Sequence, residues 1–180
     1  MPNHVRTVIK INNLKKDDID IILNLVATKL DDPDLPDRID YAIDFDKIIP
    51  EPRTKKECPK DCLVKDTKEA HIEEDEDRPW FNWYKWHNLY WGTKWGAYDP
   101  YTVIGKSYIQ FVFSTAWCTP IPIIQKLGLM GYNLSIKYAD EDYGSNCGRI
   151  TYSSEQGWQH EDSSELPNPV RFARDLWNKY

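Results

Sequence analysis

The sequence has no long apolar run and few glycines. No apolar stretch approaches the roughly 18 residues that a membrane-spanning helix needs, and the opening segment MPNHVRTVIK lacks the apolar stretch of a signal peptide. With 8 glycines among 180 residues, a collagen-like repeat is also excluded. We therefore expect a soluble, cytoplasmic protein with no membrane partner.

Basic residues are too few to predict a general nucleic-acid-binding protein. Lys and Arg number 23 against 29 Asp and Glu, so the net charge is −6, whereas a phosphate-binding surface needs clustered Lys and Arg. The carboxylates gather in three runs, within residues 31–46, 73–77 and 140–142. Such runs either keep a loop solvated or attract a basic partner surface.

Catalytic motifs are missing as well. The chain contains no phosphate-cradling G-x-x-x-x-G-K, no dinucleotide glycine pattern, no nucleophile elbow and no H-E-x-x-H. Its four histidines, at positions 4, 71, 87 and 160, have no acid or nucleophile beside them that completes a catalytic pattern. The residues therefore give no support to an enzymatic function, and no cofactor is predicted.

Cysteine is scarce, at four residues, and its spacing leaves two interpretations open. Without an export signal, reduced thiols are expected rather than a disulfide framework. Cys58 and Cys62, with His71 nine positions further on, have the spacing of part of a zinc site, but a fourth ligand is missing nearby. We expect two reduced surface thiols and no bound metal, with zinc as the alternative.

Aromatic residues are abundant instead, with 8 Trp, 11 Tyr and 5 Phe, and hydrophobic residues make up 41% of the chain. This composition is typical of a globular protein and excludes general disorder. The length fits one domain over residues 1–180. Within it, residues 51–79 carry many charges and few large apolar side chains, so we predict a charged insertion outside the core.

Hydrophobic periodicity predicts the elements around this insertion. Residues 5–11 alternate as in a half-buried strand, residues 16–30 have the apolar spacing of an amphipathic helix, and residues 41–49 read as a second strand. The later elements that we predict are helices over residues 80–91, 120–127 and 169–180, and strands over 108–114, 134–138 and 149–153.

Without the insertion, the order becomes strand, helix, strand, repeated once. This is the split βαβ plan of a ferredoxin-like α+β sandwich. We therefore predict a mainly antiparallel sheet with helices on one face, extended by an added strand and a C-terminal helix.

Several segments also resemble a known family. They are MPNHV at residues 1–5, IDFDKIIPEP at 43–52, WGTKW at 91–95, FSTAWCTP at 113–120, and YADED at 138–142 followed by Gly148. In these segments the chain resembles the YubB ferredoxin-like family, small proteins of phage, prophage and plasmid genomes whose function is unknown. The longer charged insertion, Cys118-Thr119 and the last helix depart from the family pattern. The resemblance implies a ferredoxin-like fold and a mobile-element origin, and it implies no activity.

The aromatic block over residues 80–98 contains the candidate binding residues. Two interpretations are open. Either the rings of this block only cover a thin core, or one face of the block remains free to bind a partner. Thr93 and Lys94 follow Gly92, and we expect them to meet the segment around Trp117 at one end of the sheet, where Lys94 either lies along an indole or holds an anion. The residues that we single out for ligand or partner binding are Trp83, Trp86, Tyr90, Trp91, Thr93, Lys94, Trp95 and Trp117.

Two functions follow from these residues. The first is a non-enzymatic phage or plasmid protein that binds a host intracellular protein through an acidic and aromatic surface, with an anti-defence role. The alternative is a binding protein for a small, nucleotide-like molecule, or a minor enzyme, with a pocket lined by Trp91, Thr93, Lys94, Trp95 and Trp117. Flat heterocycles would suit such a pocket because they stack on indoles beside one cation.

Overall fold

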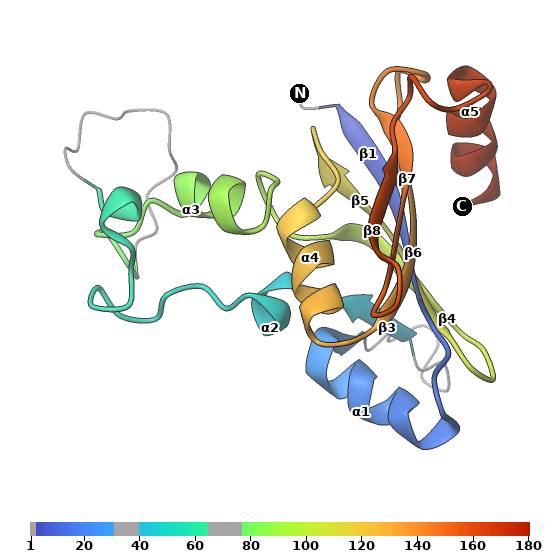
Figure 1. Ribbon diagram of the computed structural model, residues 1–180. Coiled ribbons are helices and arrows are strands. Elements are labelled where there is room, and N and C mark those ends of the chain that lie inside the picture. The colour runs from blue at the N-terminus through green and yellow to red at the C-terminus, as the bar shows by residue number, and fades with distance from the viewer. Residues whose placement is uncertain (1–2, 31–39, 65–76) are drawn as a thin grey trace.

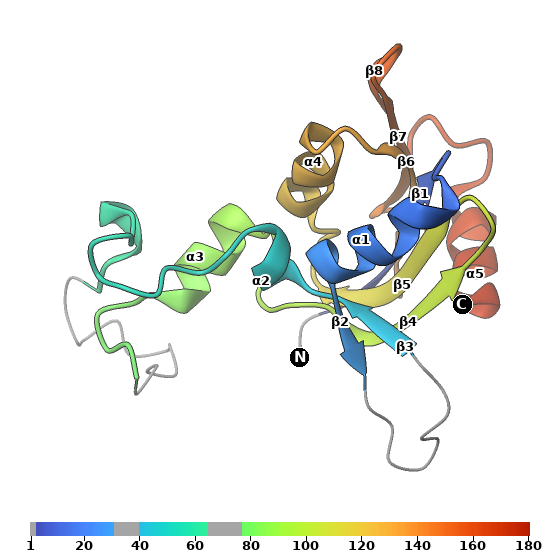
Figure 2. The same ribbon diagram turned by 90° about the horizontal axis from the view of Figure 1, so that it is seen from below.

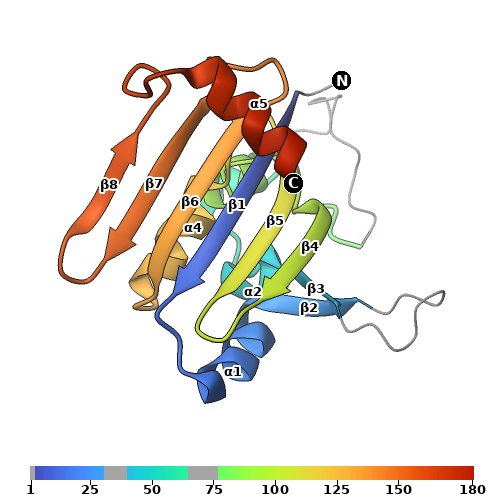
Figure 3. The same ribbon diagram turned by 90° about the vertical axis from the view of Figure 1, so that its right-hand side faces the viewer.

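The computed structural model describes residues 3–30, 40–64 and 77–180 of the chain. Six strands form one antiparallel sheet in the order β4-β5-β1-β6-β7-β8 (Figures 1 and 3). These strands are β1 (His4–Asn12), β4 (Tyr98–Ile104), β5 (Ile109–Ala116), β6 (Asn133–Asp140), β7 (Cys147–Ser153) and β8 (Gly157–Glu161). Within the described segments, no helix combines the length and the apolar character that crossing a membrane requires.

Two strand-helix-strand units interleave in this sheet. The first is β1, α1 (Lys16–Val26) and β4, and the second is β5, α4 (Ile121–Leu129) and β6. Strand β5 lies between β1 and β4, while β6 pairs with the other side of β1. This is the split βαβ arrangement, so the ferredoxin-like α+β fold predicted from the sequence is confirmed. The hairpin of β7 and β8 extends the sheet beyond β6.

The second strand of the first unit was predicted in the wrong place. Residues 41–49 do not form a strand of the main sheet: β3 (Asp40–Ile43) pairs with β2 (Ala27–Leu30) in a separate two-stranded sheet. The chain then enters the short helix α2 (Phe45–Ile48), because the Asp44 carboxylate accepts hydrogen bonds from the amides of Asp46 and Lys47. The same β2 pairing ends α1 at Val26, four residues before the predicted end of the helix at Leu30.

The strand that occupies the predicted place is β4, which the periodicity did not reveal. It contains Pro100 and an irregular register between Tyr98 and Tyr101. Both features are tolerated because β4 lies at the edge of the sheet. Strand β8, short and largely exposed, was also not predicted.

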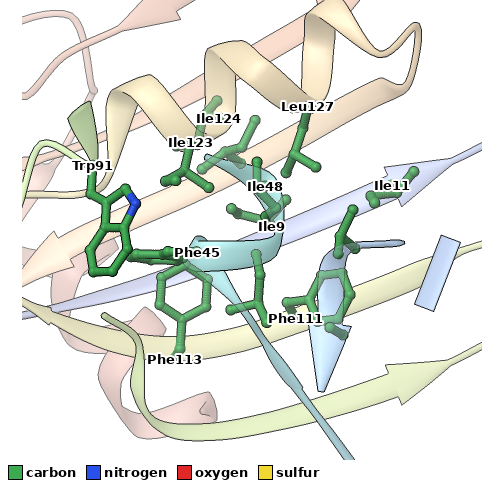
Figure 4. Close-up of a cluster of buried hydrophobic side chains, with 14 of the residues drawn as sticks. Ile9, Ile11, Phe45, Ile48, Trp91, Phe111, Phe113, Ile123, Ile124 and Leu127 are labelled. Carbon is green, nitrogen blue, oxygen red and sulfur yellow. The ribbon is translucent and has the colours of Figure 1, made fainter. Parts of the chain in front are cut away.

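One face of the sheet is covered by α1, α2 and α4. Figure 4 shows that side chains of β1 and β5, including Ile9, Ile11, Phe111 and Phe113, meet Ile123 and Leu127 of α4. Phe45 and Ile48 of α2 fill the space between these layers. The indole of Trp91 packs edge-on against Phe45, with 5.8 Å between ring centroids. The aromatic block is therefore anchored in the core at Trp91.

The opposite face carries the C-terminal helix α5 (Pro169–Lys179), which the sequence predicted. It packs Ala173 and Leu176 onto Val8, Val112 and Ala139 of the sheet. Its Trp177 indole donates a hydrogen bond to the carbonyl oxygen of Ala139, at 3.0 Å. Figure 3 shows that α5 crosses only one end of this face. Helices α1 and α4, which connect the strands of the two units, thus lie on one face of the sheet as expected. Helix α5 covers part of the opposite face.

After α2 the chain leaves the sheet and forms an arm, which we define as residues 49–64 and 77–92. The arm contains η1 (Lys60–Cys62) and α3 (Trp83–Tyr90), and it projects from the body of the molecule beside α2 and α4 (Figures 1 and 2). Helix α3 contacts η1 and lies beside the sheet rather than over it. The described parts of the predicted insertion, 51–64 and 77–79, belong to this arm.

Candidate functional site

The inner part of the arm is a packed aromatic cluster. Trp86, His87 and Trp91 are all buried. The Trp91 ring stacks on His87 with 4.0 Å between centroids, and its indole N–H donates to the carbonyl oxygen of Ile49 at 2.9 Å. Trp86 and Trp91 therefore act as core side chains of the arm, although the sequence pointed to both as binding residues.

A buried charge network ties the arm together. The Nδ1 of His87 donates to the carbonyl oxygen of Lys94, at 2.8 Å, and its Nε2 shares a hydrogen bond with Glu51, at 2.5 Å. The other oxygen of Glu51 pairs with the Arg78 guanidinium at 2.7 Å. Because a carbonyl oxygen only accepts, Nδ1 of His87 carries the hydrogen of the bond to Lys94. Burial raises the pKa of Glu51, but the hydrogen bonds from His87 and Arg78 outweigh it, so the net pKa is lowered.

The outer surface of α3 carries the remaining rings of the arm. Tyr90 is 37% exposed and stacks on Trp86 with 5.0 Å between centroids, while Trp83 is half-buried. Beside Tyr90 lies an open cavity of about 500 Å³, which is lined by residues 49–53 with Glu57, Pro59, Trp86 and Tyr90. Two of the residues that the sequence singled out, Trp86 and Tyr90, therefore line this cavity.

A second group of candidate residues meets at one end of the sheet, as predicted. Thr93 is buried, and its hydroxyl donates to the carbonyl oxygen of Ala116 at 2.9 Å. This bond joins the segment after α3 to the end of β5. Gly92 makes the turn possible: its φ is +79°, and a Cβ there would lie 2.6 Å from Pro122 Cδ.

Lys94 lies between two indoles at this junction. Its ammonium is 4.5 Å from the ring centroid of Trp95 and 5.8 Å from that of Trp117, and Tyr84 packs edge-on against Trp117 at 6.5 Å. We call these four residues the Lys94 cluster. Trp117 is 39% exposed, and within the described segments Lys94 forms no ion pair.

Trp117 has a backbone conformation that bulky residues rarely adopt. Its φ is +66°, in the left-handed region, which costs an L-residue roughly 1–2 kcal/mol. Two hydrogen bonds hold it there: its amide donates to the Asn3 carbonyl oxygen at 2.9 Å, and its carbonyl accepts from the Asn146 side chain at 2.8 Å. The ring is thus displayed on a strained turn that neighbouring segments fix in place.

An acidic turn, residues 140–142, adjoins the Lys94 cluster. The backbone of Asn3 and His4 lies between the two, because Trp117 bonds to Asn3 while the Glu141 carboxylate accepts from the His4 amide at 2.8 Å. The Asn3 side chain donates to Asp142 at 2.5 Å. Glu141 and Asp142 are exposed. The other acidic runs fall largely outside the described residues, which omit 31–39 and 65–76.

The structure therefore divides the eight predicted binding residues into three sets. Trp86, Trp91 and Thr93 are buried, Trp83 and Tyr90 lie on the arm, and Lys94, Trp95 and Trp117 form one part-exposed cluster. Sequence reasoning missed Tyr84 as a member of this cluster and the acidic turn as its neighbour. Tyr84 was visible in the aromatic block, but only the fold brings residues 84, 117 and 141 to one end of the sheet.

The cysteines of the arm form no disulfide, and they are not at the surface. Cys58 is 7% exposed and Cys62 is completely buried. Burial raises the pKa of both thiols, and the neighbouring Cys58 raises that of Cys62 further. The third candidate zinc ligand, His71, lies outside the described residues, among which no group of three or more metal-binding side chains occurs. The expectation of surface thiols was wrong because both side chains pack into the aromatic core of the arm.

Residues 87–166, from the end of α3 through β8, match a family described as the ferredoxin-like domain in Api92-like protein. The matched segment includes β4, β5, α4 and β6, so this similarity agrees with the observed fold. It also includes Lys94, Trp95, Trp117 and the acidic turn. No curated protein and no solved structure matches the chain.

Proposed function

We propose that the protein is a non-enzymatic binding protein that recognises another protein through the Lys94 cluster and the acidic turn. The observation that supports this function best is the convergence of Tyr84, Lys94, Trp95 and Trp117 beside Glu141 and Asp142 at one end of the sheet. These residues come from four separate segments of the chain.

The chemistry of this surface suits a protein partner. Part-exposed tryptophan and tyrosine rings are typical of interface hot spots, because they bury a large area and lose little conformational entropy. The ammonium of Lys94 is already positioned by two rings, so a carboxylate or carbonyl of the partner would find an oriented donor. Glu141 and Asp142 at the rim would steer a basic surface toward the cluster.

The strained backbone of Trp117 supports the same conclusion. A φ of +66° is unfavourable for tryptophan, and glycine or asparagine would meet the requirement of the turn more easily. Strain of this kind is typically retained where a displayed side chain has a function.

The biological setting that we propose is the cytoplasm of a bacterial host. The resemblance to the YubB family, whose members belong to phage, prophage and plasmid genomes, supports a mobile-element protein of that kind. In that setting, the host partner would be a defence factor or a nucleic-acid-processing factor. The protein would counter the action of this factor by binding it.

The alternative, a pocket for a nucleotide-like molecule, is less well supported. Of the five residues expected to line it, Trp91 and Thr93 are buried, and their polar groups are already bonded to Ile49 and Ala116. A thermal-shift screen with nucleotides would favour this alternative if a ligand raised the melting temperature of wild-type protein but not of a Lys94→Ala variant.

Affinity capture from bacterial lysate tests the proposed function. Tagged wild-type protein is compared with Trp117→Gly, which removes the ring and suits the turn, and with Glu141→Gln/Asp142→Asn. Leu129→Ser is the control, because Leu129 is 80% exposed on α4, outside the proposed surface.

We expect wild type and the control to retain the same partner, Trp117→Gly to lose it, and the neutralised turn to bind it more weakly at low salt. Identical recovery of partners by all four proteins would contradict the proposal.

A further inference from the structure

The sheet face that carries α5 is basic, although the chain as a whole is acidic. Lys137 on β6 stands opposite Val8 on β1 and Arg149 on β7, so all three side chains share this face. Arg6 and Lys10 flank Val8 at two-residue spacing and point the same way. Across β5, β1, β6, β7 and β8, this face therefore has four cations, and its one carboxylate is Glu161, opposite Arg149.

Much of this face is open. Helix α5 crosses one end and leaves the rest of the strands uncovered in Figure 3. Lys137 and Arg149 are exposed, and Lys10 is half-buried. Next to Lys137 and Arg149 along the strands lies a row of neutral polar side chains in register with Lys10: Gln110, Ser135, Thr151 and Gln159.

Three of the cations lie over aromatic rings. The Arg6 guanidinium is 5.0 Å from the Trp177 ring centroid, the Lys10 ammonium is 3.9 Å from that of Tyr108, and the Arg149 guanidinium is 5.1 Å from that of Phe172. These rings hold the cations on the sheet surface without neutralising them. Alternation of cations with rings is a common feature of surfaces that bind single strands.

The cations have little internal charge compensation. Within the described parts of the chain, Arg6, Lys10 and Lys137 form no ion pair, and the Arg149–Glu161 pair at 3.2 Å is exposed. The Nε of Arg6 is buried with no hydrogen-bond partner. The net positive charge of this face is therefore not cancelled by ion pairs within the described parts of the chain.

We infer that this face binds single-stranded RNA. The four cations would neutralise phosphates, and the neutral row with Lys10 would hydrogen-bond base edges and 2′-hydroxyl groups. The acidic 140–142 turn does not lie among these cations, since it bonds to Asn3 and His4 at the end of the sheet beside the Lys94 cluster. The inference is independent of the proposed protein-binding surface.

The test is fluorescence anisotropy with a labelled oligouridine on the full-length protein. Oligodeoxythymidine of the same length, an RNA duplex and a polyglutamate peptide are the competing probes. Lys10→Gln/Lys137→Gln is compared with Lys56→Gln/Lys126→Gln, which removes the same charge from exposed positions of the arm and α4.

We expect wild type and the control to bind oligouridine, and the first variant to bind it about tenfold or more weakly. Its slope of log K against log salt should be smaller in magnitude by about 1.4, because two phosphate contacts are lost. Equal affinities of both variants would overturn the inference. Binding of oligodeoxythymidine, duplex or polyglutamate as tightly as oligouridine would overturn the assignment to single-stranded RNA.

Two variants that introduce a negative charge test the inference if the lysine variant is unstable. Ser135→Glu places a negative charge on the exposed part of this face, and Gln125→Glu places one on exposed α4. Both variants should keep the melting temperature of wild type, and only Ser135→Glu should weaken oligouridine binding. Equal affinities of these two variants for oligouridine would also overturn the inference.

Discussion

The inner and outer parts of the aromatic block differ in what their rings contact. Trp91 and His87 are buried against α2 and the backbone of the arm, whereas Trp95, four residues beyond Trp91, is half-buried beside Lys94. The inner rings fix the arm to the body, and the outer rings remain available. Both sets of rings belong to one aromatic block in the sequence, so the neighbouring segments decide which ring stabilises and which ring is displayed.

Replacement of an inner ring should give the largest effect on stability. Trp91→Ala removes a buried indole that contacts Phe45, Trp86 and His87, and we expect a loss of about 3–5 kcal/mol in the free energy of unfolding. Trp95→Ala should cost less than about 1 kcal/mol. Urea unfolding of both variants gives the comparison, and equal losses would show that the distinction between inner and outer rings is wrong.

Disruption of the network of Glu51, His87 and Arg78 should have the second largest effect on stability. Glu51→Gln leaves Arg78 and His87 without their shared carboxylate, so we expect a loss of about 2–4 kcal/mol at neutral pH. The exposed Glu155→Gln is the matched control.

The same network predicts a pH dependence. Because the pKa of Glu51 is lowered in the folded protein, its stabilising contribution is present above about pH 4.3, the ordinary glutamate value, and is lost as the pH falls through the folded pKa. Glu51→Gln should therefore lose less stability than wild type between pH 5 and pH 3, as followed by thermal unfolding. A parallel loss in both proteins would contradict the role of Glu51.

The buried thiols of the arm should give a smaller effect. Cys62→Ser introduces a hydroxyl at a completely buried position, and we expect a loss of about 1–2 kcal/mol. Cys118→Ser, at an exposed position, should leave the unfolding free energy unchanged. Metal analysis of the purified wild-type protein checks the assignment as free thiols, and stoichiometric zinc would refute it.

Replacement of the displayed ring should have the smallest effect on stability. Trp117→Gly loses the contacts with Lys94 and Tyr84 but relieves the left-handed φ, and glycine adopts that conformation without strain. We expect the free energy of unfolding to change by less than about 1 kcal/mol. A loss comparable to that of Trp91→Ala would mean that Trp117 is a structural residue, and that the Lys94 cluster is not a surface for a partner.

Local pattern was sufficient for most of the fold. The alternation around Ile9, the helical spacing before Val26 and the proline before α4 each identified an element, because those segments have one apolar face and one partner layer. The pattern failed where a cap or an edge position outweighed it. Asp44 starts a helix inside an apparent strand, and Pro100 conceals an edge strand.

The sequence by itself determined the composition of the candidate site: a dense aromatic block, a lysine after Gly92 and an acidic turn. Only the tertiary structure decided which of these residues meet. Hydrogen bonds between Thr93 and Ala116, and between Trp117 and Asn3, join segments far apart in the chain. The basic face arises in the same way, because the register of the sheet brings Lys10, Lys137 and Arg149 close together. The positions of these residues along the chain do not predict that they are neighbours.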